Sequence, residues 1–273
     1  MSPIVPRDPD VDVAGIPRHW LANNATATAI ANGVNLLFPH GERFFVRSVR
    51  HFLDRIDDPV LRAQIKGFFG QEGRHAHAHD RVNTVLRGQG FEVDRFLRRY
   101  QRIASWIEAH TPPKLNLAIT AAMEHFTAIL AEGAFTYSIL DQAAPAMRRL
   151  LAWHAAEEIE HKAVAFDVLR CVAPSYALRM IGLAYATVLL GGFWMWGTAS
   201  LLRQERRLGG ASTTRRRRAS AARDPIVRRV FLRGIGQYIR PSFHPSQNAD
   251  EQLAVTWMAA RGIALPGQSH EAA

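Results

Sequence analysis

The strings Glu72-Gly73-Arg74-His75 and Glu158-Ile159-Glu160-His161 decide the fold that this sequence predicts. Each places a Glu and a His three residues apart inside a long segment with a helical pattern. Residues three apart lie one turn apart on one helix face, so each string directs a carboxylate and an imidazole to one point. Two such strings, with one Glu from each of two further helices, form the ligand set of a dinuclear metal site in a four-helix bundle.

The segments around these strings predict an all-α protein. Helix start and stop signals, such as Asp57-Asp58-Pro59 and Gly88 with Gly90, delimit the expected helices. These helices span residues 38–56, 59–87, 92–109, 114–140, 145–172, 225–238 and 250–260. Alternating Val-, Ile- and Thr-rich runs are absent, so no sheet is expected. We therefore predict a four-helix bundle with additional C-terminal helices.

The chain is expected to divide into three parts. Residues 1–34 form an extended N-terminal arm, residues 35–207 the metal-binding helical bundle, and residues 208–273 a basic loop with short C-terminal helices. The N-terminus lacks the apolar region of a signal peptide, and the only cysteine, Cys171, excludes an intrachain disulfide framework. A cytoplasmic protein is therefore expected, peripheral or re-entrant at the inner membrane in one interpretation.

That interpretation rests on the apolar segment 180–202, which carries no charged residue and is long enough to cross a bilayer. Three alternatives remain open: a packed helix covering the bundle, insertion at the membrane surface, and a full span. The net charge of +10 gathers mostly in the Arg-rich region 203–240. Such a region suits anionic lipid. Nucleic acid is not expected as a partner, because no recognised binding motif accompanies the arginines.

Further histidines share the faces of the two strings. With Glu72 at zero and about 100° per residue, His75 falls near −60° and His79 near −20°. With Glu158 at zero, His161 falls near −60° and His154 near −40°. His79 and His154 are thus candidates for a further ligand, a partner of a ligand or a catalytic base that contacts substrate.

The other two long helices each offer one carboxylate. Glu42 is followed by apolar neighbours, and Glu124 lies in a segment poor in charge. A charge on an apolar helix is costly unless it is paired or bound to metal, so both are candidate ligands. Two alternatives stay open: Glu157 as a rival of Glu158, because it also reaches His161, and Glu132 as a substitute carboxylate.

The strings Gln71-Glu72-x-x-His75-x-x-x-His79-x-x-x-Asn83 and His154-x-x-x-Glu158-x-Glu160-His161-Lys162-x-Val164-Ala165-Phe166-Asp167 resemble a bacterial family described as predicted metal-dependent hydrolases. The order of Glu and Glu-x-x-His helices also resembles the ferritin-like di-iron carboxylate proteins. The resemblance implies a ferritin-like bundle. It also implies a set of metal ligands: Glu42, Glu72, His75, Glu124, Glu158 and His161.

This donor set suits two divalent metal ions, iron in the first place, with manganese or a mixed pair as alternatives. With iron, the ligand set favours an oxidoreductase that uses O2 to oxidise a hydrophobic small molecule. The alternative is hydrolysis by a metal-bridged water, as the family description implies. The expected partners are an apolar substrate, a membrane surface reached through 180–202 and 203–240, and a second copy of the chain in a homodimer.

Overall fold

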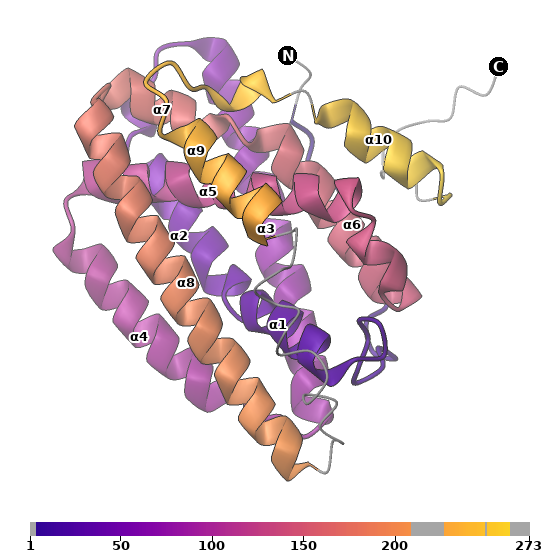
Figure 1. The fold of residues 1–273 in the computed structure, drawn as a ribbon. Coiled ribbons are helices and arrows are strands. Elements are labelled where there is room, and N and C mark those ends of the chain that lie inside the picture. Colours follow the sequence, from indigo (N-terminus) through magenta and orange to yellow (C-terminus); the bar gives the residue numbers. More distant parts are fainter. Residues whose placement is uncertain (1–3, 209–226, 249, 263–273) are drawn as a thin grey trace.

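Helices make up the described part of the chain, which comprises residues 4–208, 227–248 and 250–262 of the computed structural model (Figure 1). The α-helices are α1 (Ala25–Asn35), α2 (Phe38–Arg50), α3 (Pro59–Gly88), α4 (Asp94–His110), α5 (Pro113–Thr136), α6 (Pro145–His161), α7 (Val164–Val172), α8 (Tyr176–Arg207), α9 (Arg233–Tyr238) and α10 (Glu251–Ala259). Within these ranges the only β-type pairing is an isolated bridge between Leu21 and Ala143. The predicted all-α bundle is confirmed.

The helices begin where the sequence supplies capping groups. The Asp58 side chain accepts a hydrogen bond from the Val60 amide at the start of α3, and Pro59 occupies the first helical position. The Ser175 side chain accepts from the Leu178 amide at the start of α8. These bonds satisfy amides that have no partner within the helix, which explains why the predicted helix starts lie close to the observed ones.

Several segments differ from the prediction. The helices expected over 38–56 and 114–140 end earlier, at Arg50 and Thr136, and 3-10 turns follow at Leu53–Arg55 and Ile139–Gln142. Part of the expected extended arm forms helix α1, which Asn24 caps by accepting from the Ala27 amide. The helix expected over 145–172 is divided into α6 and α7 after His161. At this break the Lys162 ammonium forms an ion pair with Asp250, which directly precedes α10.

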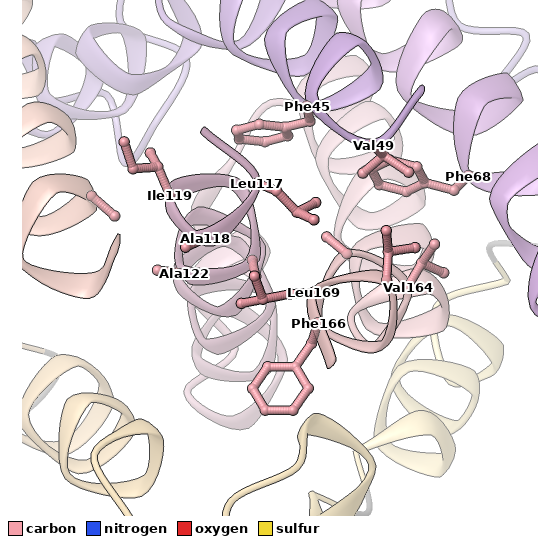
Figure 2. Close-up of a cluster of buried hydrophobic side chains, with 14 of the residues drawn as sticks. Phe45, Val49, Phe68, Leu117, Ala118, Ile119, Ala122, Val164, Phe166 and Leu169 are labelled. Atoms are coloured by element: carbon pink, nitrogen blue, oxygen red, sulfur yellow. The ribbon is translucent and has the colours of Figure 1, made fainter. Parts of the chain in front are cut away.

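The core lies between α2, α3, α5 and α7. Phe45 and Val49 of α2, Phe68 of α3, Leu117 of α5 and Val164 of α7 are buried in one cluster (Figure 2). Complete burial of such a side chain stabilises the fold by roughly 1.5–3 kcal/mol. The cluster fixes the relative positions of the helices that carry the polar site described below.

Helix α8 contains the apolar segment 180–202 and runs unbroken along the outside of the bundle (Figure 1). It packs closely on α5 at Gly182, where a Cβ would lie 2.6 Å from the Ala118 backbone. It packs on α1 through the Trp194 indole, which donates to the Ile30 carbonyl over 2.8 Å. By length and composition α8 is the one described helix able to cross a membrane, and 22% of its most apolar window is buried inside the bundle.

The remaining predicted elements lie near the C-terminus. The segment expected as a helix over 225–238 begins, in its described part, with a π-helical turn (Val227–Leu232) and continues as α9. The loop predicted from Leu208 to Asp224 lies outside the described residues after Leu208, as does the tail from Gly267 to Ala273.

Candidate metal centre

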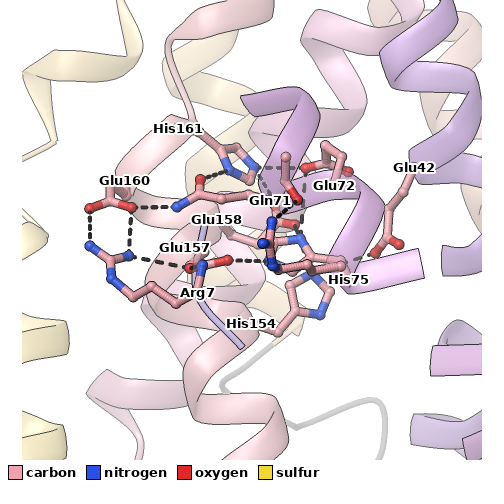
Figure 3. A network of polar contacts seen from close by, with 12 residues as sticks. Arg7, Glu42, Gln71, Glu72, His75, His154, Glu157, Glu158, Glu160 and His161 are labelled. Atoms are coloured by element: carbon pink, nitrogen blue, oxygen red, sulfur yellow. Dashed lines mark hydrogen bonds and ion pairs between the residues drawn. The ribbon is translucent and has the colours of Figure 1, made fainter. Parts of the chain in front are cut away.

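Four helices bring the predicted site residues together in the interior of the bundle (Figure 3). Helix α2 supplies Glu42, and α5 supplies Glu124. The other residues come from α3 and α6, and all are buried: Glu72, His75, His79, His154, Glu158 and His161. The one-turn spacing within α3 and α6 places each Glu and His on the inner helix face, as the sequence predicts.

The possible ligand atoms form two groups. Glu42, His75, His154 and Glu158 each offer one atom in the first group, and Glu72, Glu124 and His161 in the second. Within each group these atoms lie within 4.8 Å of one another. The groups adjoin, because a Glu158 oxygen of the first lies 3.6 Å from His161 Nε2 of the second. The arrangement has the form of two neighbouring metal positions.

His161 is oriented by a hydrogen bond from its Nδ1–H to the Gln71 side chain. Its Nδ1 lies 2.8 Å from the Gln71 side-chain oxygen, and the Gln71 amide nitrogen donates to the Val5 carbonyl and to Glu160. The Gln71 oxygen must therefore accept from His161 Nδ1–H. In the neutral imidazole, Nε2 is then an unprotonated lone pair that faces Glu72 at 3.0 Å and Glu124 at 3.4 Å.

His75 is oriented in the same way by a different partner. Its Nε2–H donates to the Glu157 carboxylate over 3.0 Å, which leaves the Nδ1 lone pair facing Glu158 at 3.6 Å. Glu157 is held in turn by Arg7 of the N-terminal segment, which also forms a paired contact with Glu160 (Figure 3). Glu157 thus lies behind His75, outside both groups, and does not take the place of Glu158 that the rival interpretation gave it.

His154 is oriented by a chain of buried polar side chains. The Asn35 amide nitrogen donates to Asn83, so the Asn35 oxygen accepts from His79 Nδ1–H over 2.6 Å. His79 Nε2 then accepts from His154 Nδ1–H, also over 2.6 Å. The remaining His154 nitrogen, Nε2, forms a hydrogen bond with Glu158 over 2.7 Å and lies 3.7 Å from Glu42. His154 therefore joins the first group, whereas His79 lies behind it.

Burial and the carboxylates themselves shape the electrostatics. Burial, followed by repulsion from Glu72 and Glu158, raises the pKa of Glu42 well above its ordinary value. Burial raises the pKa of Glu124 to about 7. Burial would lower the pKa of His161, but Glu158 and the other carboxylates outweigh it and raise that pKa well above its ordinary value. The site therefore attracts positive charge.

The residues fit a pair of cations. Both oxygens of Glu42, Glu72 and Glu124, one oxygen of Glu158, and the inner nitrogens of His75 and His161 are buried without a hydrogen-bond partner among the described residues. Leaving so many polar atoms unsatisfied is costly. Where the carboxylates are ionised and the imidazoles neutral, their facing atoms cannot hydrogen-bond to one another, because neither then carries a hydrogen to donate. Metal ions are the natural partners of such a donor set.

Sequence reasoning missed three residues that orient the histidines. Arg7, Gln71 and Asn35 hold Glu157, His161 and His79, respectively. Gln71 carried a signal, since it directly precedes Glu72 in the first motif string. Glu132, considered as a substitute carboxylate, lies outside both groups, with one oxygen 3.7 Å from the Arg233 guanidinium.

An apolar pocket meets the first group at Glu42. It lies between α2, α4, α5 and α8, and its cavity volume is about 80 Å³. Its walls include Phe45 of α2, Ile107 of α4, Ile119 of α5 and Leu190 of α8. Glu42 is thus shared by the candidate metal centre and the pocket, which gives an apolar molecule a place beside the metal positions.

A sequence model of the family described as predicted metal-dependent hydrolase matches residues 5–249. The match covers every candidate ligand as well as Arg7 and Asn35. No curated protein and no solved structure matches the chain.

Proposed function

Because the chain belongs to the family of predicted metal-dependent hydrolases, we propose that it is a dinuclear metal enzyme that hydrolyses an ester or amide of an apolar molecule. One observation carries this proposal: three imidazoles and four carboxylates converge in a buried space, where both oxygens of Glu42, Glu72 and Glu124 and the inner nitrogens of His75 and His161 have no hydrogen-bond partner among the described residues. When bound, a pair of divalent ions would lower the pKa of a water molecule and polarise a substrate carbonyl.

The protein's own residues would hold the metals and place the substrate. Glu42, His75, His154 and Glu158 would hold one ion, and Glu72, Glu124 and His161 the other, with Glu158 between them. Iron is the metal that we favour, with manganese or a mixed pair as alternatives. The pocket would bind the apolar part of the substrate and direct its polar end to Glu42.

His79 would act on the reaction through His154. It is separated from the candidate ligand atoms by the His154 ring, and its own Nδ1–H is bound to Asn35. We therefore assign it the role of a positioning residue, instead of the catalytic base that its place on the helix first suggested.

Oxidation of an apolar molecule with O2 is the second candidate. It is favoured by the donor set, in which carboxylates outnumber imidazoles, a composition that suits redox-active iron or manganese. The family description supports hydrolysis better, so oxidation takes second place.

A paired assay separates the two reactions. Protein loaded with Fe²⁺, Mn²⁺ or Zn²⁺ would be incubated with p-nitrophenyl acyl esters of increasing chain length, with and without O2. We expect metal-dependent cleavage that is independent of O2, is lost in Glu158→Gln and is kept in Glu132→Gln. Absence of cleavage, together with O2 consumption by the iron-loaded protein and an oxidised product, would favour the second candidate.

A further inference from the structure

Helices α4 and α8 lie side by side on the outside of the bundle (Figure 1). The rings of Phe96 and Tyr100 on α4 contact those of Trp196 and Phe193 on α8. Large apolar side chains of the two helices are exposed to solvent. They form what we call the α4–α8 face: Ile103, Trp106, Val188 and Met195, with exposed fractions of 43, 62, 71 and 70%.

Arginines flank the α4–α8 face. Arg95, Arg98 and Arg102 are exposed on α4, and Arg203, Arg206 and Arg207 on the last turns of α8. None of these six has a carboxylate within ion-pair distance in the described part of the chain. The acidic residues of the two helices are engaged elsewhere: Asp94 with Arg87, Glu108 with Arg47, and Glu205 with Arg18.

The same two helices form a wall of the pocket. Ala104 and Ile107 of α4, with Leu189, Leu190 and Phe193 of α8, line the space whose inner end is Glu42. Residues on opposite sides of α4 and α8 therefore reach either the solvent or the apolar space beside the candidate metal centre. An apolar molecule that passes between these helices would need no aqueous step.

We propose that the α4–α8 face docks on an anionic lipid bilayer and that the pocket takes a single-chain lipid ester from it; this substrate class rests on the proposed hydrolase function. Exposed apolar side chains bordered by unpaired arginines match the two parts of such a surface, the acyl region and the negative headgroups. The apolar segment 180–202 thus lies along the bilayer surface with its inner side packed on α5 and α1.

Vesicle sedimentation tests the docking. The full-length protein would be mixed with phosphatidylcholine vesicles, with and without one third phosphatidylglycerol. We expect binding to the anionic vesicles that falls about tenfold or more in Trp106→Ser/Val188→Ser and in Arg98→Glu/Arg102→Glu. Matched controls are Val60→Ser on α3, which is equally exposed, and Arg74→Glu/Arg149→Glu on α3 and α6. These controls should bind as the parent protein does.

Three results would overturn the proposal. The first is absence of binding to anionic vesicles, and the second is an equal loss of vesicle binding in the face variants and the controls. The third is a stable dimer that Trp106→Ser/Val188→Ser dissociates, because the face would then bind a second copy of the chain. Metal content and cleavage of a short soluble ester should be unchanged in the face variants, whereas cleavage of a long-chain ester embedded in vesicles should fall. If the parent protein binds anionic vesicles but cleaves no ester, the hydrolase function is refuted and the docking surface is retained.

Discussion

The Nε2 atom of His79 lies 2.6 Å from Nδ1 of His154, inside the protein and on the side of His154 that faces away from the carboxylates. Asn35 accepts from the other nitrogen of His79, so the hydrogens of the chain all point outward from the candidate metal centre. In a neutral His154, the contact therefore selects the tautomer whose Nε2 lone pair is directed to Glu42 and Glu158.

Loss of this contact should weaken one metal position. Partners behind a metal-bound histidine typically contribute 10–100-fold to affinity, and we expect a loss of about that size for the more weakly held ion in His79→Ala. His77→Ala is the matched control, because His77 lies on the same helix but is exposed. Calorimetric titration of metal-free protein measures both. Equal affinities in the two variants would show that His79 does not position His154.

The N-terminal segment should contribute to metal affinity through Glu157. Glu157→Leu removes the acceptor of His75 Nε2–H, so we expect metal affinity to fall about 10–100-fold, and Arg7→Ala to cause a smaller loss. Arg18→Ala is the control, because Arg18 also anchors this segment but pairs with Glu205, which is in neither ligand group. The assignment fails if Arg18→Ala lowers affinity as much as Arg7→Ala does.

The metal-free protein should lose stability as the pH rises through about 7. Burial raises the pKa of Glu124 and Glu157 from 4.5 to about 7, so each contributes stability that is present below pH 4.5 and lost as the pH rises to about 7. Burial lowers the pKa of His75 and His79, which has the opposite effect only below their unfolded value of 6.5. Above pH 6.5 the carboxyl groups therefore determine the pH dependence, and stability falls as the pH rises.

Thermal unfolding between about pH 6.5 and about pH 8 measures this effect. In chelator, the midpoint should fall with rising pH. The increase caused by excess Mn²⁺ should grow over the same interval, because ligands must be deprotonated to bind metal. A metal-induced increase that shrinks with rising pH would contradict the assignment of these carboxylates.

Gly182 and Gly191 of α8 differ in the space that surrounds them. A Cβ at Gly182 would lie 2.6 Å from the Ala118 backbone, whereas one at Gly191 would meet nothing within 4 Å. We expect Gly182→Ala to lower the free energy of unfolding by about 1–3 kcal/mol. Gly191→Ala should raise it by about 0.5–1 kcal/mol, because alanine favours the helix. Denaturant unfolding measures both, and similar values for the two variants would contradict the packed position of α8.

Much of the fold and of the ligand groups could be predicted because the signals are local. Prolines and caps such as Asp58 mark helix starts, and the three-residue spacing of Glu158 and His161 fixes their common face. The long-range contacts could not be predicted in this way. Arg7 and Glu157 are 150 positions apart, and no periodicity in either segment specifies that they meet.

Helix α1 shows the same limit in the fold. Its sequence, ATATAIANGVN, is rich in residues with low helix propensity, which favours the extended arm that was predicted. Packing overrides this preference: Gly33 allows close approach of Thr198 on α8, and Asn32 accepts a hydrogen bond from the Trp20 indole. These partners become adjacent only in the folded protein.

Metal content per chain tests the central claim most directly. After loading and desalting, elemental analysis should find about two metal ions in the parent protein and in Glu132→Gln, and about one or fewer in Glu124→Gln. Glu124 and Glu132 lie on the same helix, and only Glu124 belongs to a ligand group. A parent protein that holds fewer than about one ion per chain, or equal losses in the two variants, would contradict a two-metal centre built on these residues.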